Sequence, residues 1–478
     1  MRGALYPMVS TPALRPVTTR VLMKSHSLAR FIGAAAALFL LSSCSAPPLD
    51  ELERSALDEI RERTIGGDAP SSRDSALPPT ADPKDGLTED EAAAIALWRN
   101  PDFAATLTEL GLARSDLVQA GLLTNPVFSF LFPLGSKEYE FALKLPLEIF
   151  WLRPGRVALA GKRLERAGKL LVQKGLDLVR DARVAHSELL LAAERLRLAR
   201  EAADIADRVA RVAEVRVQAG DAGEIEASTA RMDSLLFREE ALRLEGELAI
   251  SRERLRATLA LPLELDFNAV ESAPPPAVPA EDLLLVDALL SRPDLRAARL
   301  AVEGAEERLH LAKLEIVKVA GVLDANENRG GDLQIGPGVE LELPVFDQNQ
   351  GVVARAEAEL ERSVLDERAL SEKILSEVRE SRIRWQSASE EDARWTDRIL
   401  PQLEDLVRRA EVAYAAGDAS IVLVLESTSS LVRGRGRRVE AVARLRRARA
   451  DLERSVGRRV GIDEPAPATT TALAGTGR

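Results

Sequence analysis

The strongest constraint on this chain is an internal repeat. The tetrapeptide Ala-Gly-Asp-Ala stands at 219–222 and again at 416–419, each time between two long stretches of helical pattern. The offset between the two copies is 417 − 220 = 197 residues, counted from glycine to glycine. Two further landmarks repeat at nearly the same offset: Pro101 with Pro293, 192 residues apart, and Pro146 with Pro344, 198 apart. Recurrence at a fixed offset predicts two halves with one structural plan.

The repeat sets the expected organisation of the 478 residues. We expect a first structural repeat at 87–270 and a second at 281–460. The connector at 271–280 contains three consecutive prolines, which would end any helix. The stretch at 44–86 is rich in Pro, Ser, Asp and Gly, so it is interpreted as a linker with no apolar face to bury. Residues 461–478 are expected to form a flexible tail.

Each half is expected to fold in the same order: a helix, two short strands, a very long helix, the Gly-Asp turn and a return helix. The first helix opens with a capping box, because Thr88 is followed three residues later by Glu91. The long helix of the first half is predicted to begin near Pro154, since proline suits a first helical turn. It should run to about Gly220, roughly 65 residues or about 100 Å at 1.5 Å per residue.

Two apolar stripes follow this long helix. One is an a/d heptad pattern over almost six heptads, formed by Leu178, Ala185, Ala192, Ala199, Ala206 and Ala213 with Ala182, Leu189, Leu196, Ala203, Ala210 and Val217. The other lies beside it and consists of Leu191, Leu198, Ala202, Ile205, Val209 and Val212. Two stripes predict two neighbouring helices, as in a wall of helices curved into a tube. A plain two-stranded coiled coil is the alternative on the helices alone.

Three short segments have the pattern of strands. EYEFALKLP (138–146) and GVELELP (338–344) alternate apolar with mostly charged residues, and VFSFLF (127–132) places three phenylalanines on one side. A soluble sheet would give the same pattern, but four short strands cannot supply a core beneath helices this long. We therefore expect membrane-barrel strands with a lipid-facing apolar side and a polar lumen. Phe150 and Trp151 fit an interfacial aromatic girdle.

Four strands per chain are too few to close a barrel, which needs about eight. The barrel is therefore expected to be shared between chains. The fold class predicted from the sequence is mainly α, with long helices and a β-barrel membrane part.

The repeated Gly-Asp turns are interpreted as the far ends of two helical hairpins. Glycine permits the positive φ angle that ends a helix, so Gly220 and Gly417 are expected at these turns. Asp221 and Asp418 are expected to cap the N-termini of the return helices, the second of which should begin at about Ala419. Both turns should lie at the same end of the molecule, opposite the strands.

Residues 1–43 have the pattern of a secretory signal: a basic stretch, the ten-residue apolar run 31–40 and small residues before Cys44. Met23 is the better start site, since the residues before it would make an unusually long basic region. The ending Leu-Ser-Ser-Cys resembles a bacterial lipobox, in which the cysteine becomes the acylated N-terminus. Ser45 after it favours delivery to the outer membrane. An ordinary signal peptide with an incidental cysteine is the alternative.

Charge and motif content exclude several function classes. No later stretch reaches 18 apolar residues, so no transmembrane helix is predicted. The formal net charge of −11 argues against nucleic acid as the main partner. One arginine cluster lacks interleaved aromatics and is interpreted as a solvated helix face: Arg433, Arg435, Arg437 and Arg438.

Catalysis finds no support in the sequence. His26 lies in the signal, and His186 and His310 are isolated on helical segments, where a solvated or core role is expected. The sequence has no Gly-rich phosphate loop, metal cluster or nucleophile motif. We therefore expect no enzyme activity, no cofactor and no metal site.

Four segments, in order, resemble recurrent segments of the TolC family of outer-membrane efflux proteins. They are LTEDEAAAIALWRNPDF (87–103), AGLLTNPVFSF (120–130), LPVFDQNQGVVARAEAEL (343–360) and ILPQLEDLVRRAEVAYAAGDASIVLVLES (399–427). The resemblance covers about 87–460, and the acylated N-terminus is similar to that of lipoprotein members. It implies a homotrimer, in which each chain gives four strands to one 12-stranded barrel and a third of a long α-helical barrel in the periplasm.

The resemblance also implies partners and site residues. Substrate would pass from an inner-membrane pump, of RND or ABC type, through a periplasmic adaptor (a membrane fusion protein) and out of this passive duct. Adaptor contact is implied at the tips, Gly220–Asp221 and Gly417–Asp418. Family members often carry acidic residues just past the second tip as a pore constriction. Here 421–426 reads IVLVLE, with Leu423 at the first acidic position and Glu426 at the second.

One competing function comes from another class: a lipid-anchored periplasmic coiled-coil scaffold without a pore. It would explain the heptads but not the charged strand faces or the duplication. On the channel interpretation the protein lies in the outer membrane, is lipid-anchored and extends into the periplasm. The substrate is not predicted, because a passive duct leaves selection to the pump.

Overall fold

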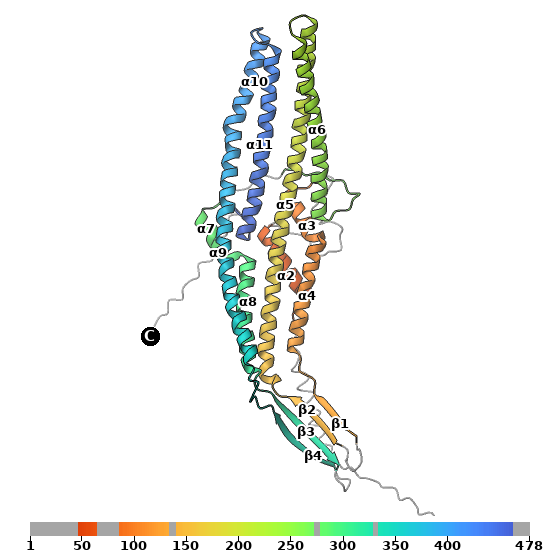
Figure 1. The fold of residues 1–478 in the computed structure, drawn as a ribbon, viewed down its shortest axis with the longest axis vertical. Coiled ribbons are helices and arrows are strands. Elements are labelled where there is room, and N and C mark those ends of the chain that lie inside the picture. Colours follow the sequence, from red (N-terminus) through yellow and green to blue (C-terminus); the bar gives the residue numbers. More distant parts are fainter. Residues whose placement is uncertain (1–45, 65–85, 133–139, 272–277, 328–332, 462–478) are drawn as a thin grey trace, which may run out of the picture.

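The computed structural model describes residues 46–64, 86–132, 140–271, 278–327 and 333–461. The molecule is long and narrow, with a sheet at one end, the tips of two helical hairpins at the other and short helices around the middle (Figure 1). The predicted fold class, long helices with four strands per chain, is confirmed. The signal segment, Cys44 and the tail after residue 461 lie outside the described residues.

The order of elements repeats within the chain. After a leading helix, α2 (Leu49–Thr64), the first half contains α3 (Glu89–Arg99), α4 (Pro101–Gly121), β1 (Val127–Leu131), β2 (Glu140–Pro146), α5 (Ile149–Gln218) and α6 (Glu224–Leu259). The second half contains α7 (Glu281–Ser291), α8 (Pro293–Leu314), β3 (Val319–Glu327), β4 (Leu333–Leu341), α9 (Gln350–Arg394), the π-helical turn η1 (Trp395–Ile399), α10 (Leu400–Ala415) and α11 (Ile421–Val456). Pro101 and Pro293 each stand in the first turn of a helix, as equivalent positions of a repeat should.

Helix α2 corrects the expectation that 44–86 is a linker throughout. Its buried residues recur at intervals of four, which makes one helical face: Ala56, Ile60 and Thr64. Gly175 of α5 lies opposite this face, and a Cβ built there would stand 2.5 Å from Ile60 Cδ1. The missing side chain therefore lets the two helices approach closely. The Pro- and Gly-rich composition of the later part of 44–86 obscured this short amphipathic segment.

The long helix also begins earlier than predicted. Helix α5 starts at Ile149, so Pro154 lies inside it and not in its first turn. The turn forms because Phe150 N donates to Leu147 O at 3.1 Å directly after Leu147 N closes the sheet against Val319 O at 2.7 Å. Proline so near a helix end removes only one backbone hydrogen bond, which the helix tolerates.

Both predicted stripes of α5 are buried or partly buried, each against a different neighbour. The alanine-rich heptad stripe meets α6, where Ala210 and Ala213 pack with Ala227 and Ala230. The second stripe meets α11 in a cluster of Leu198, Ile205, Leu425 and Val432. Two neighbours for one helix confirm a wall of helices, and Figure 1 shows α11 and α6 on either side of α5.

The four strands form one antiparallel sheet in the order β1-β2-β3-β4. Cross-strand partners place apolar residues on one face: Phe128, Phe130, Phe141, Leu143, Leu323, Ile335, Val339 and Leu341. The other face carries Lys144 and Glu340, whose Nζ and Oε2 atoms are 2.5 Å apart. The predicted two-sided strands are therefore confirmed. Strands β1 and β4 each have one edge without a partner strand among the described residues.

Candidate functional site

The candidate site is the end of the molecule formed by the two hairpin tips. Helices α5 and α6 meet at one tip, and α10 and α11 meet at the other, both at the end opposite the sheet (Figure 1). The prediction that both Gly-Asp turns share this end is confirmed. The two tips belong to equivalent parts of the two halves, so their turns are expected to have the same backbone hydrogen bonds.

The two turns are built alike. Gly220 and Gly417 have φ angles of +81° and +82°, a region that favours glycine. Asp221 N donates to Arg216 O at 2.8 Å, and Asp418 N donates to Ala413 O at 2.9 Å. A bond from the residue after a left-handed glycine to a carbonyl five residues back is the Schellman ending of a helix. The expectation that both glycines end their helices at a positive φ angle is confirmed.

The expected capping role of the two aspartates is wrong. The N-cap residues of α6 and α11 are Gly223 and Ser420, and neither makes a side-chain capping bond. The Schellman motif uses the backbone N–H of each aspartate, and one further residue, Ala222 or Ala419, separates the aspartate from the N-cap. Asp221 and Asp418 therefore stand two positions before the N-cap and not at it. Both lie exposed at the tips.

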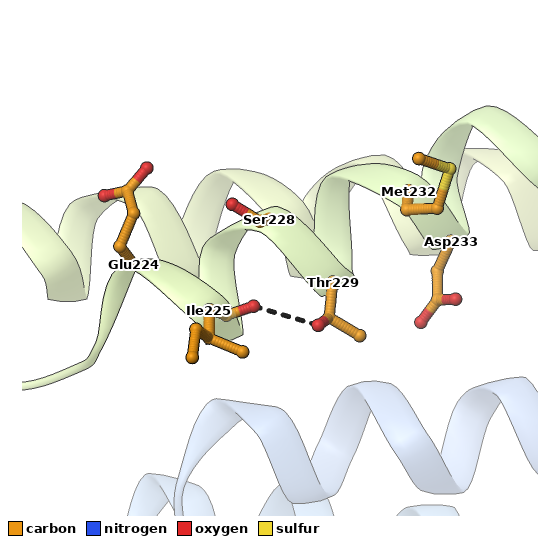
Figure 2. Close-up of a pocket in the computed structure, with 6 residues that line it drawn as sticks. All are labelled: Glu224, Ile225, Ser228, Thr229, Met232 and Asp233. Atoms are coloured by element: carbon orange, nitrogen blue, oxygen red, sulfur yellow. Dashed lines mark hydrogen bonds between the residues drawn. The ribbon is translucent and has the colours of Figure 1, made fainter.

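An open hollow of about 370 Å³ lies on α6 just past the first tip. Figure 2 shows its lining, which combines carboxylates, hydroxyls and two apolar side chains: Glu224, Ile225, Ser228, Thr229, Met232 and Asp233. Thr229 Oγ1 donates to Ile225 O at 2.9 Å, so this hydroxyl is partly satisfied within the helix. Ile225 is 83% exposed, which is unusual for isoleucine in a lone soluble chain. The surface at this tip is therefore mixed, with an apolar anchor among polar groups.

A ladder of ion pairs joins α5 to α6 behind the first tip. It repeats every seven residues along each helix: Arg200 with Glu245 at 2.5 Å, Asp207 with Arg238 at 2.5 Å and Glu214 with Arg231 at 3.0 Å. Arg216 and Glu226 add a fourth pair at the tip itself. Hydrogen bonds from Arg238 and Ser234 lower the pKa of Asp207. The sequence analysis did not predict this ladder. Charged residues spaced seven apart on both helices would have indicated it.

The residues of the predicted constriction lie just past the second tip, near the start of α11. Leu423 is 46% exposed and Glu426 is exposed, while Leu425 between them is buried against α5. Residues three apart share a helix face, so Leu423 and Glu426 point the same way. The structure therefore brings the two together on one open face of α11.

The middle of the molecule holds a buried charge network that the sequence did not indicate. Arg183 of α5 is 5% exposed and lies 3.0 Å from Asp90 and 3.3 Å from Glu89 on α3. It also pairs with Glu453 of α11 and donates to Thr64 O at the end of α2, at 2.9 Å. Burial outweighs the neighbouring arginine and raises the pKa of Glu89. One guanidinium thus joins four helices.

The described histidines fit the structural role expected of them. His186 is buried, with Nε2 2.7 Å from Leu87 O, and desolvation lowers its pKa. His310 is exposed on α8. Among the described residues no group of three His, Cys, Asp or Glu side chains could hold a metal ion. In the same part of the chain, no helix has the length and hydropathy needed to cross a membrane.

Comparisons with known proteins identify a matching family model, a related protein and solved structures with a similar fold. A family model described as "Outer membrane efflux protein" matches residues 92–261 and 284–458. The cobalt-zinc-cadmium resistance protein CzcC of Cupriavidus metallidurans is 25% identical over 388 residues, covering 78% of this chain and 90% of that protein. The outer-membrane channel OprN has a TM-score of 0.64 at 17% identity, over 77% of this chain and 89% of that one. VceC of Vibrio cholerae, an outer membrane protein, has a TM-score of 0.60 at 18% identity. The match covers 78% of this chain and 96% of VceC.

Proposed function

The chain belongs to the outer membrane efflux protein family, and on that premise we propose that three copies form a passive duct through which a tripartite system exports substrate from the periplasm. The observation that carries the proposal is the two-sided sheet at one end of a wall of helices whose tips lie at the other end. An inner-membrane pump, of RND or ABC type, would supply the energy, and a periplasmic adaptor would join pump to duct.

The sheet supports a barrel shared by several chains. An open four-stranded sheet leaves the edges of β1 and β4 with unpaired backbone groups, which is costly within a membrane. Pairing β4 of one copy with β1 of the next removes both edges, and three copies give twelve strands. The apolar face with Phe130 and Phe141 would then meet lipid, and Lys144 and Glu340 would line the lumen.

The outer helices of the wall support the same ring. Ile225 and Val412 are 83% and 66% exposed, and each lies five residues from its tip glycine (225 − 220 and 417 − 412). Met232 and Leu406 are also exposed, 12 and 11 residues from the tips. Exposed apolar side chains at matching heights on α6 and α10 would cover one another if α6 packed against α10 of the next copy. A contact between different surfaces closes into a ring when the rotation allows it.

The tips are proposed to dock the adaptor. Gly220, Asp221, Gly417 and Asp418 are exposed at the far end of the duct, where a periplasmic partner would approach. The hollow beside the first tip adds carboxylates and a hydroxyl to this surface, from Glu224, Asp233 and Ser228. Polar groups of this kind are typical of the rim of a protein interface.

Leu423 and Glu426 are proposed to form the periplasmic constriction. Both lie on one exposed face just past the second tip. In a trimer they would give a ring of three leucines and, about one turn further from the tip, a ring of three glutamates. Such a carboxylate ring would attract cations and bind multivalent ones.

Lipid attachment at Cys44 is proposed, and the position of the chain after it fits a membrane anchor. Arg114 of α4 donates from Nε to Pro47 O at 2.7 Å. Pro47 is three residues from Cys44, a distance that chain geometry limits to about 10 Å. Arg114 stands seven residues before Gly121, the last residue of α4, which is also about 10 Å along the helix. Cys44 can therefore reach the level at which the helices meet the strands.

The assembly is tested in outer-membrane fractions of cells that express the full chain. A trimer that survives electrophoresis without boiling, and that conducts ions in planar bilayers, is the expected result. A monomer released into the periplasmic fraction once the lipid is removed would instead support a lipid-anchored scaffold without a pore.

A further inference from the structure

A stripe of exposed residues, interrupted by the half-buried Ser430, runs along α11 away from the second tip. Leu423, Glu426, Ser430, Arg433 and Arg437 follow one another at intervals of three or four residues, which places all five on one helix face. Arg433 donates to Ser430 Oγ at 2.9 Å, so its side chain lies along this face toward Glu426. The face that carries the proposed constriction therefore continues into arginines.

The charge of these arginines is only partly balanced. Arg433 has no ion pair within the part of the chain that the structure describes. Arg437, whose side chain is 70% exposed, lies 3.4 Å from Glu440. The same carboxylate also lies 2.8 Å from Arg195 of α5 and 4.0 Å from Arg444. Arg444 pairs more closely with Glu391, at 2.7 Å, so Glu440 is shared mainly between Arg195 and Arg437. The stripe therefore keeps an excess of positive charge.

On the opposite face of α11, at the same level along the helix axis, the arginine is paired with carboxylates. Arg435 stands two residues from both Arg433 and Arg437, which is about 200° around the helix. Its guanidinium lies between two carboxylates, 3.6 Å from Glu201 of α5 and 3.8 Å from Glu404 of α10. On that face the arginine binds to neighbouring helices, whereas Arg433 and Arg437 remain available to a ligand.

We propose that Arg433 and Arg437 form a basic collar on the wall of the duct that attracts anionic cargo beyond the acidic ring of Glu426. The inference rests on the proposed function, which places Leu423 and Glu426 at the lumen. At 1.5 Å per residue, the two arginines lie about 10 Å and 16 Å from Glu426 along the helix. Three copies would bring six guanidinium groups into one short section of the channel.

Guanidinium groups suit this role chemically. Arginine stays charged at every physiological pH, and its planar group binds carboxylates and phosphates through two parallel hydrogen bonds. A narrow passage lined by charge of one sign concentrates ions of the opposite sign. Gly436 leaves further room beside the stripe, since a Cβ built there would meet nothing within 4 Å. The cargo class that this section would favour is a molecule with carboxylate or phosphate groups.

The test measures ion selectivity and block in planar bilayers that contain the full-length channel. The double variant Arg433→Gln/Arg437→Gln is compared with Glu426→Gln and with the control Arg435→Gln, on the opposite face of the same helix. The reversal potential in a KCl gradient gives selectivity, and inorganic triphosphate is the blocking anion. We expect the double variant to shift selectivity toward cations and to weaken the triphosphate block about ten-fold, the value of one charge-assisted hydrogen bond. Arg435→Gln should leave both unchanged.

The outcomes separate the collar from the constriction. If Glu426→Gln shifts selectivity toward anions while the double variant changes nothing, the collar is refuted and the constriction stands. If the double variant acts and Glu426→Gln does not, the collar stands and the constriction at Glu426 fails. A change in Arg435→Gln alone would place the other face of α11 in the lumen and overturn both. Trimer formation is checked for every variant, so that loss of assembly is recognised.

Discussion

Asp207 of α5 and Arg238 of α6 face one another across the first hairpin, with Oδ2 2.5 Å from Nη2. Pairs on either side repeat at seven-residue spacing, so one side of this hairpin is held by charge along much of its length. The second hairpin has a cross-helix pair of this kind at Arg435 and Glu404, at 3.8 Å, well behind its tip. Among the described residues, cross-helix ion pairs therefore extend to the first tip but not to the second.

Loss of one pair in this ladder should loosen the first tip locally. Asp207→Asn removes the charge that Arg238 and Ser234 stabilise, and exposed pairs contribute little, so we expect amide exchange near the tip to rise only about two-fold. The lowered pKa of Asp207 means that its contribution is present above the unfolded pKa of about 3.9 and is lost as the pH falls through the folded value. Hydrogen exchange of the tip amides at pH 7 measures the effect of the substitution, and the same measurement at pH 3 shows whether that effect disappears in acid.

Glu411→Gln, an exposed change on the second hairpin, is the control. Equal exchange of the first-tip amides in Asp207→Asn and Glu411→Gln at pH 7 would contradict the prediction.

The tip glycines should be needed for their backbone conformation and for docking. An added Cβ at Gly220 or Gly417 would meet nothing within 4 Å, so Gly417→Ala should cost about 1 kcal/mol of unfolding free energy through its positive φ alone. Gly223 has equal space but a φ of −86°, so Gly223→Ala adds no positive-φ strain and should cost only what alanine loses to glycine as the N-cap, less than Gly417→Ala. Thermal unfolding of Gly417→Ala and Gly223→Ala measures the two losses of stability.

Gly417→Trp should in addition abolish adaptor crosslinking and export while trimers persist. Unchanged crosslinking in both Gly220→Trp and Gly417→Trp would show that the tips do not dock the adaptor.

The docking of α2 should depend on a glycine of α5. Gly175→Ala would place a methyl group 2.5 Å from Ile60 Cδ1, so we expect a loss of about 1–3 kcal/mol of unfolding free energy and faster proteolysis of α2. Gly161→Ala, at an open helical position, should instead stabilise by up to about 1 kcal/mol. Similar proteolysis of α2 in the two variants would mean that close packing at Gly175 does not hold it.

Lipid attachment should require Cys44. Metabolic labelling with palmitate should mark the wild type and leave Cys44→Ala unlabelled. The variant should still form trimers, because the strands provide their own hold on the membrane. Label that persists in Cys44→Ala would exclude this cysteine as the acylated residue.

Stability should fall in mild acid through His186. Burial lowers its pKa in the folded state, so the unfolded chain binds a proton more readily once the pH drops below about 6.5. The stability that the neutral ring provides is therefore present above that pH and declines below it. His186→Gln should reduce the loss of stability between pH 6.5 and 5, followed by denaturant unfolding. The exposed His310→Gln is the control, and an identical pH dependence in wild type and His186→Gln would rule out His186 as the cause.

Local patterns in the sequence were enough to predict most of the elements and their repeat, though not α2. The heptad alanines of α5, the alternation in β2 and the left-handed glycines at 220 and 417 each reflect a rule that acts within a few residues. The duplication then placed both tips at one end. Such features need no knowledge of distant contacts, because backbone geometry and side-chain periodicity alone specify them.

Contacts between distant segments decided the rest. Helix α2 exists as a docked element because Gly175, more than a hundred residues later, leaves space for Ile60. Arg183 is buried because Asp90 and Glu453 come to it from two other helices. The arginines of α11 looked alike in sequence, yet Arg435 lies near carboxylates of two neighbouring helices while Arg433 donates to Ser430 of its own helix. Burial and charge pairing depend on which helices become neighbours, and only the tertiary structure determines that.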